Sequence, residues 1–78
     1  MFNERLRSQR RKTKYTQQNM ADILGVTLNA YQKYEQGERS PSFDCLVKIA
    51  DIFQVPIDYL LCRDDFLKSL GVSVDEYQ

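Results

Sequence analysis

The apolar residues between positions 16 and 37 recur at helical spacing, so they predict two short helices joined by a tight turn. The first helix opens at Thr16, whose hydroxyl can accept a hydrogen bond from one of the free N–H groups at a helix start. Gly25 follows where a left-handed residue ends a helix with little strain. Thr27 caps the second helix in the same way, and Gly37 ends it. The small residue Ala21 lies where the two helices would cross, so we predict a helix-turn-helix.

The second of these helices has two chemically different faces. The face predicted to point inward carries Ala30, Tyr31, Tyr34 and Glu35. The opposite face is rich in amides, and its candidates for DNA base contacts are Thr27, Leu28, Asn29, Gln32 and Lys33. Asn and Gln can each make paired hydrogen bonds to adenine, Lys can reach guanine or phosphate, and Leu can pack on the thymine methyl group. A helical hairpin without this role would share the caps and glycines but would not need such a face.

A tyrosine is a large residue for the interior of so small a helical pair. Tyr31 is therefore expected either to have smaller neighbours or to reach the surface with its hydroxyl group.

Three further helices are predicted around this motif. The first spans about residues 3–12 with Asn3 as its N-cap, and a later helix spans residues 43–53 with Ser42 as its N-cap. The apolar stripe of this later helix is expected to be core, and it consists of Phe43, Leu46, Ile49, Ala50 and Phe53. Gln54 then stands where a helix-ending Gly or Asn is common. Pro56 suits the first turn of the next helix, over residues 57–62.

Residues 63–78 carry a weaker helical pattern. Phe66, Leu67 and Leu70 are the apolar residues of a helix of one or two turns, with Gly71 as its stop. Ser73 and Glu76 have the spacing of a capping box. The whole pattern predicts an all-α, compact five-helix bundle with a short sixth helix near its C-terminal end.

The charges are distributed unevenly along a chain whose net charge is zero. Residues 1–40 carry eight Lys and Arg against four Asp and Glu, whereas residues 41–78 carry three against seven. The molecule is therefore expected to have a positive side, and a polyanion would meet that side.

Composition excludes several other classes of site. Seventy-eight residues make one small domain, and without histidine or a CxxC pair a metal site is not expected. Cys45 and Cys62 each lie in an apolar helical pattern, so we expect free, buried thiols in a reducing cytoplasm. We expect no signal peptide, no membrane-spanning segment, no cofactor and no small-molecule ligand. With no serine nucleophile motif and no Gly-rich phosphate loop either, the protein is not expected to be an enzyme.

Several short motifs resemble those of the Cro/cI-type helix-turn-helix regulators of bacteria and phages, also called the xenobiotic response element family. In chain order they are R-L-R at 5–7, T-Q at 16–17, M-A at 20–21, L-G-V at 24–26, Y-E-x-G-x-R-x-P at 34–41, L-x-x-I-A at 46–50 and D-Y-L-L at 58–61. The resemblance covers about residues 2–62 without a gap. It implies a lambda-repressor-like DNA-binding domain over residues 1–62, and it leaves residues 63–78 as an extension for packing or dimerisation.

The resemblance also implies roles for individual residues. Relatives pair an arginine at Arg10 with a glutamate at Glu35, and the amide at Gln17 bridges a phosphate and the recognition helix. The candidate phosphate contacts are Arg11, Lys14, Thr16, Gln17, Gln18, Gln36, Arg39 and Ser40. Many members dimerise through the fifth helix and the segment after it, so the candidate homodimer interface is Tyr59, Cys62, Phe66 and Leu70. Packing of this segment against the core is the alternative.

Two functions from different classes remain. The first is a sequence-specific regulator of transcription that binds double-stranded DNA, acts as a repressor and inserts residues 28–36 into the major groove. The second is an antitoxin-like or adaptor module that binds another protein and leaves the groove face unused. The basic N-terminal half and the amide-rich face favour DNA.

Overall fold

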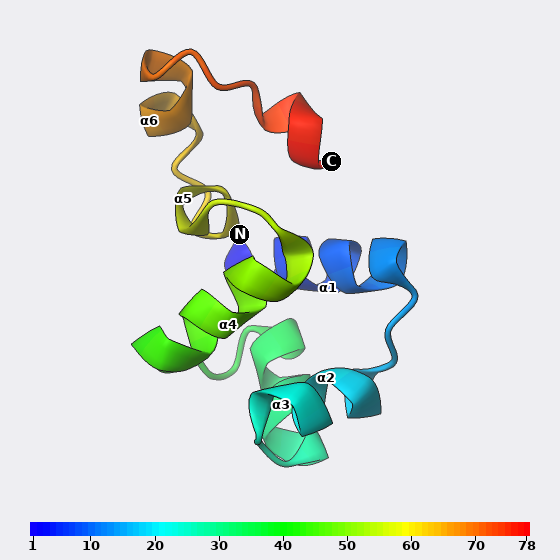
Figure 1. Ribbon diagram of the computed structural model, residues 1–78. Helices are drawn as coiled ribbons and strands as arrows, with labels where there is room; N and C mark the ends of the chain where they lie inside the picture. Colours follow the sequence, from blue (N-terminus) through cyan, green and yellow to red (C-terminus); the bar gives the residue numbers. More distant parts are fainter.

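The computed structural model describes residues 1–78, and they form six α-helices followed by one short 3₁₀-helix. The elements are α1 (Phe2–Thr13), α2 (Gln17–Leu24), α3 (Leu28–Gln36), α4 (Phe43–Phe53), α5 (Ile57–Leu60), α6 (Asp64–Ser69) and η1 (Val74–Tyr77). The molecule measures 37 × 22 × 19 Å along its principal axes. Figure 1 shows α2 and α3 at one end, α6 at the other, and α1 and α4 between them. The all-α prediction is thus confirmed, including the sixth helix.

Side-chain capping starts three of these helices as predicted. Thr16 Oγ1 accepts from the Asn19 backbone N–H at 3.0 Å, and Thr27 Oγ1 accepts from that of Ala30 at 3.1 Å. Ser42 does the same for α4. Each hydroxyl satisfies a backbone donor that has no partner within its helix.

The turn between α2 and α3 depends on the backbone of one glycine. Gly25 has a φ of +71°, and nothing lies within 4 Å of the position that a Cβ atom would take. Its N–H donates to the carbonyl groups of Ala21 and Asp22. Glycine is therefore required at this point for its left-handed conformation and not for close packing.

Two helix boundaries differ from the predictions. Helix α1 begins at Phe2 with Met1 as its N-cap, so the expected cap at Asn3 is wrong. Helix α5 ends at Leu60, and Pro56 occupies its N-cap position with an extended ψ of 146°. Cys62, which was expected to be helical, has a φ of +61° and marks the turn toward α6.

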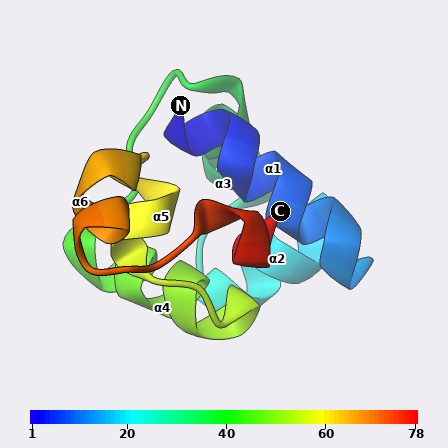
Figure 2. The ribbon, with the colours of Figure 1, turned by 90° about the horizontal axis from the view of Figure 1, so that it is seen from above.

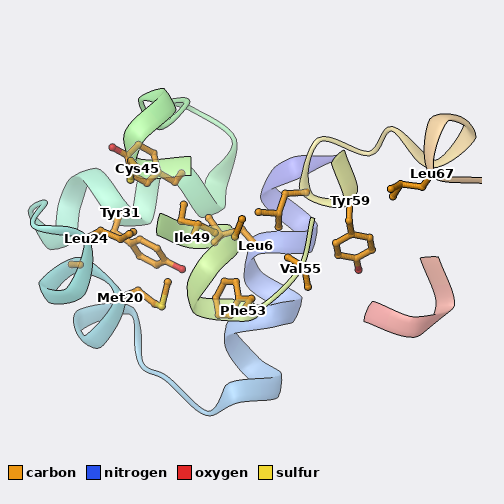
Figure 3. Close-up of a cluster of buried hydrophobic side chains, with 14 residues drawn as sticks. Leu6, Met20, Leu24, Tyr31, Cys45, Ile49, Phe53, Val55, Tyr59 and Leu67 are labelled. Atoms are coloured by element: carbon orange, nitrogen blue, oxygen red, sulfur yellow. The ribbon is translucent and has the colours of Figure 1, made fainter. Parts of the chain in front are cut away.

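A single hydrophobic core runs along the length of the molecule. Figure 3 shows Tyr31 at the α2–α3 end, Leu6 and Ile49 in the middle, and Tyr59 and Leu67 toward the opposite end. The buried apolar residues are Leu6, Met20, Ala21, Leu24, Tyr31, Tyr34, Cys45, Ile49, Ala50, Phe53, Val55, Tyr59, Leu60 and Leu67. Helix α2 contributes Met20, Ala21 and Leu24 to this set.

The predicted core stripe of α4 is wrong at its first position. Phe43 is 73% exposed, whereas Cys45 is buried. Phe43 opens the helix, and the buried face continues from Cys45 through Ile49 and Phe53 at intervals of four. Leu46 is only partly buried at the margin of this face. Both cysteines are free, and burial raises the pKa of the Cys45 thiol.

The C-terminal segment folds back onto the bundle. The buried Gln9 side chain of α1 donates to the Tyr77 carbonyl group, and the Tyr77 ring lies 5.2 Å from the ring of Tyr59 between centroids. Figures 1 and 2 both show the end of the chain next to α1, and Figure 1 places it on the side of α1 away from α2 and α3. Ser73 caps η1 through the Asp75 N–H, so the predicted capping box with Glu76 is not the contact that forms.

This packing overturns one part of the predicted dimer interface. Tyr59 is 2% exposed and lies inside the monomer, so it offers no surface to a second copy. Tyr59 is buried because Tyr77 returns to pack against it. The two residues lie on either side of α6 in the chain, so the local sequence pattern does not reveal their contact.

Arg5 makes a second long-range connection that the sequence did not reveal. Its guanidinium group donates to both carboxylate oxygens of Asp64 at 2.7 Å and lies 4.3 Å above the centre of the Tyr59 ring. Hydrogen bonding within this pair raises the pKa of Arg5 and lowers the pKa of Asp64. The pair ties α1 to α6.

None of the helices has the length and apolar character needed to cross a bilayer.

Candidate nucleic-acid interface

The outer face of α3 is open to solvent at the positions expected to contact bases. Asn29 and Lys33 are exposed, and neither side chain makes a hydrogen bond or ion pair within the protein. Leu28 is 36% exposed beside them. The C-terminal segment packs at the other end of the molecule and leaves this face uncovered (Figure 1). The major groove of a duplex is wide enough to admit an α-helix, so the exposed polar face of α3 can reach base edges there.

Thr27 caps α3 in a way that is compatible with a DNA contact. Its oxygen accepts from the Ala30 N–H, which leaves the hydroxyl hydrogen free to donate outward. Thr16 has the same geometry at the start of α2. The first turn of α2 contains no acidic residue, so its free N–H groups and positive dipole end are not neutralised.

The inner face of α3 carries an ion pair to α1. Arg10 Nε lies 2.5 Å from Glu35 Oε2, and Arg10 Nη2 lies 3.2 Å from Glu35 Oε1. Arg10 also donates to the Tyr15 carbonyl group, so it spans the link between α1 and α2 as well. The structure therefore contains the contact that the family resemblance implied.

The Tyr31 hydroxyl completes this buried cluster and excludes one of the two expected alternatives. It does not reach the surface, because it donates to Glu35 Oε2 at 2.6 Å inside the protein. Burial, followed by the adjacent carboxylate, raises the pKa of Tyr31 well above its ordinary value. Burial also acts to raise the pKa of Glu35, but hydrogen bonds from Arg10, Tyr31 and Gln17 outweigh it, so the pKa of Glu35 lies below its usual range.

Gln17 links this cluster to the exposed face. Its amide nitrogen donates to Glu35 Oε1 at 3.1 Å, and its amide oxygen accepts from Gln32 Nε2 at 3.2 Å. Gln32 is accordingly half-buried and not fully exposed like Asn29. Gln18 instead bonds Asp22 one turn further along α2.

Four exposed basic residues of the N-terminal half have neither an acidic partner nor a side-chain hydrogen bond within the protein. They are Arg11, Lys14, Lys33 and Arg39. Lys14 has a φ of +64° at the end of α1, and Arg39 follows α3 in an exposed loop with Ser40. Gln36 is exposed at the end of α3. Of the predicted phosphate contacts, Arg11 and Lys14 precede α2 in the chain, and Thr16, Gln17 and Gln18 lie at its start. The others, Gln36, Arg39 and Ser40, lie at the end of α3 and after it.

The exposed acids of the C-terminal half lie on α4, α6 and η1, and comprise Asp44, Asp51, Asp65, Asp75 and Glu76. The N-terminal half exposes three acids, Glu4, Asp22 and Glu38. The one cleft, of about 430 Å³, lies between α6 and η1 and is lined by three aspartates and Lys68. No group of three or more His, Cys, Asp or Glu side chains is arranged to hold a metal ion.

Comparison with known proteins agrees with this geometry. A helix-turn-helix family model matches residues 6–60. The chain is 51% identical over 61 residues to the uncharacterized HTH-type transcriptional regulator YqaE of Bacillus subtilis (strain 168), which covers 78% of this chain and 53% of that protein. It is 48% identical over 60 residues to the cryptic phage CTXphi transcriptional repressor RstR of Vibrio cholerae, which covers 77% of this chain and 54% of that protein.

A third relative is similar over the same region. The SPbeta prophage-derived uncharacterized HTH-type transcriptional regulator YonR of Bacillus subtilis is 46% identical over 61 residues, covering 78% of this chain and 56% of that protein. The chain spans about half the length of these relatives. No solved structure matches it significantly. The family match and these identities show that the chain belongs to the Cro/cI-type helix-turn-helix family.

Proposed function

We propose that the protein is a sequence-specific regulator of transcription that binds double-stranded DNA and represses its target. The observation that carries the proposal is the uncovered outer face of α3, where Asn29 and Lys33 have no partner within the protein. The relatives' names, two of which refer to phages or prophages, support a regulatory role of this kind. Such a regulator has no catalytic step, and we place it in the cytoplasm of a prokaryotic cell, where its DNA is.

The proposed docking places α3 in the major groove and α2 across the phosphate backbone. Asn29 and Gln32 then contact base edges, together with Thr27, Leu28 and Lys33. Arg11, Lys14 and Gln17 anchor the backbone on one side of α3, while Gln36, Arg39 and Ser40 anchor it on the other. Base contacts supply sequence preference, whereas phosphate contacts fix the register and make affinity depend on salt.

We also propose that the working unit is a homodimer. Leu70 is 62% exposed, and Phe66, Leu61 and Cys62 offer further partly exposed surface near it in the chain. A twofold pair would address two half-sites separated by about one helical turn, roughly 34–36 Å. Residues 1–62 then form the DNA-binding part, and residues 63–78 both close the core and supply the dimer contact.

Selection of bound sequences from random duplex DNA tests the function. We expect the protein to enrich a defined site, and we expect Asn29→Ala to lose preference at particular base pairs. Lys14→Ala should weaken binding to all duplexes about equally and reduce the slope of log affinity against log salt by about 1. Lys48→Ala, on α4, is the matched control and should change neither property, because Lys48 is exposed and belongs neither to the proposed DNA contacts nor to the proposed dimer segment.

Two results would argue against the proposal. One is salt-insensitive binding, or no binding, by the unsubstituted protein together with stoichiometric capture of a protein partner. That outcome favours the interaction module, for which the exposed Phe43 and Leu70 would provide contacts. The other is an equal loss of affinity on every sequence for Asn29→Ala and Lys14→Ala, which would remove the distinction between base readers and phosphate anchors.

A further inference from the structure

Four polar side chains form a continuous path from the interior to the reading face. The path runs from Arg10 to Glu35, from Glu35 to Gln17, and from Gln17 to Gln32. Glu35, within the path, is buried, and the outer end at Gln32 lies among the residues assigned to base contacts. The direction of each hydrogen bond in the path is set by the chemistry of the group that precedes it.

Glu35 sets the first direction because an ionised carboxylate can only accept hydrogen bonds. Its oxygens receive the Arg10 guanidinium group, the Tyr31 hydroxyl and the Gln17 amide. Gln17 must therefore turn its nitrogen toward Glu35 and its oxygen away from it. The reverse orientation would place the Gln17 oxygen against a carboxylate oxygen, 3.1 Å away, with no hydrogen between them.

Gln17 sets the second direction in the same way. Its outward oxygen can only accept, so Gln32 must present its amide nitrogen to it, as the 3.2 Å contact shows. One N–H of Gln32 is used in this bond. The amide oxygen of Gln32 and its second N–H remain available to a ligand. Because the bond to Gln17 fixes the amide plane, the positions of this acceptor and this donor cannot be exchanged.

We propose that Glu35, acting through Gln17, fixes the order of acceptor and donor that Gln32 presents to DNA, so that Gln32 accepts adenine on one strand of the duplex and rejects it on the other. The inference rests on the proposed function and deepens it, because it makes two residues that need not touch the base into determinants of its identity. Glu35 and Gln17 are positioning residues in this scheme.

The major groove provides the reason that this order matters. Adenine offers a donor at N6 beside an acceptor at N7, and an A·T pair presents them in the opposite order to a T·A pair. Guanine offers two acceptors, O6 and N7, and so does not match one acceptor and one donor. An amide free to rotate by half a turn fits both A·T and T·A, whereas an amide held by Gln17 fits one of them.

The test compares duplexes that differ only by inversion of one base pair. Gln32→Ala first identifies the pair, as the position at which preference is lost in a selection experiment. Affinity is then measured at that position for A·T and T·A with the unsubstituted protein, Gln17→Leu and Gln18→Leu. Gln17→Leu breaks the path but leaves the Arg10–Glu35 pair in place, and Gln18→Leu is a control on the same turn whose only side-chain partner is Asp22.

We expect the unsubstituted protein to prefer one orientation by about 5- to 150-fold, the range that one bidentate pair supplies. Gln17→Leu should reduce this ratio to less than about threefold, while Gln18→Leu should preserve it. Glu35→Gln, measured on protein shown to be folded by circular dichroism, should reduce the ratio as well, because an amide at this position can satisfy either orientation of Gln17. A purely structural role for Glu35 would change affinity for both duplexes and leave their ratio unaltered.

The possible results separate this inference from the function on which it rests. A uniform loss of affinity in Gln17→Leu, with the ratio unchanged, overturns the fixed-order inference and leaves DNA binding intact. Unchanged preferences in Gln32→Ala also overturn it, since Gln32 would then not read a base. Absence of sequence-selective binding by the unsubstituted protein overturns the proposed function and this inference together.

Discussion

Arg10 and Glu35 form an ion pair in which Arg10 Nε lies 2.5 Å from Glu35 Oε2, between the second half of α1 and the end of α3. The Glu35 side chain is 2% exposed and that of Arg10 is 13% exposed. Removing two charges from water offsets much of their mutual attraction, so such a pair adds little net stability compared with an apolar contact. Its consequence is geometric, because it holds α3 at one angle to α1.

Loss of Arg10 should therefore be more damaging than loss of the whole pair. We expect Arg10→Met to lower the free energy of unfolding by about 3–5 kcal/mol, because Glu35 stays buried without its main donor. The double variant Arg10→Met/Glu35→Met should be substantially more stable than that single variant. Urea unfolding followed by circular dichroism measures both. A decrease below about 1 kcal/mol for Arg10→Met would show that Glu35 does not depend on this partner.

Acid should destabilise the fold through the same carboxylate. The pKa of Glu35 in the folded protein lies below its ordinary value of 4.5, so the unfolded chain binds more protons around that pH. The contribution of Glu35 is complete above pH 4.5 and is lost as the pH falls through the folded pKa. Asp64 acts in the same direction from its ordinary value of 3.8, because Arg5 lowers its pKa.

The measurement is the urea midpoint as a function of pH. We expect it to fall below pH 4.5, and we expect Glu35→Gln to flatten part of that fall. Asp65→Asn is the control, since Asp65 is an exposed neighbour of Asp64 without an ion pair, and it should keep the profile of the unsubstituted protein. A profile of Glu35→Gln parallel to that of the unsubstituted protein would assign the acid sensitivity to other groups.

Features that depend on a few neighbouring residues were predictable from the sequence. Thr16, Thr27 and Ser42 cap their helices, and Gly25 and Gly37 end theirs, because capping involves groups no more than about five residues apart. The inward direction of Tyr31, Tyr34 and Glu35 also followed from the period of the helix. These local rules were sufficient to predict which face of α3 points into the core.

Contacts between distant segments were not predictable in this way. Gln9 is polar, yet its side chain is buried and donates a hydrogen bond to the carbonyl group of Tyr77, 68 residues later in the chain. The same return of the chain covers Tyr59, and no segment returns to cover Phe43. The period of a helix gives the direction of each side chain but not the segment that will cover it. The Tyr31 hydroxyl is a different case, because it donates to Glu35 one turn later in the same helix, a pairing that the helical spacing allows but does not specify.

Gln54 occupies a strained backbone position that can be relieved. It ends α4 with a φ of +55°, a conformation that costs a residue with a Cβ atom about 1–2 kcal/mol. Gln54→Gly should therefore stabilise the protein by about 0.5–1 kcal/mol after the greater freedom of glycine in the unfolded chain is included. Thermal unfolding measures the gain. Gln54→Ala keeps the Cβ atom and should give no gain, so equal stabilisation by both would rule out backbone strain as the cause.

The two leucines of the C-terminal segment should respond oppositely to substitution. Leu67 is 3% exposed in the core, whereas Leu70, one turn later, is 62% exposed. Leu67→Ala should lower the free energy of unfolding by about 2–4 kcal/mol through the lost burial and the cavity that it leaves. Leu70→Ala should change the stability of the monomer by less than about 0.5 kcal/mol. Urea unfolding at low protein concentration makes the comparison, and equal losses would contradict the packing of this segment.

Leu70 also distinguishes a monomer from the proposed homodimer. If this surface joins two copies, Leu70→Asp introduces a charge at the contact on both of them, and burying an unpaired charge is strongly unfavourable. We expect the unsubstituted protein to sediment as a dimer at micromolar concentration and Leu70→Asp to sediment as a monomer. Lys48→Ala, at an exposed position of α4, lowers the net charge by one unit as Leu70→Asp does, lies outside the proposed dimer segment and should sediment as a dimer. Identical sedimentation of all three proteins would mean that the segment serves only to close the core, because the most exposed of its large apolar side chains would then be dispensable for assembly.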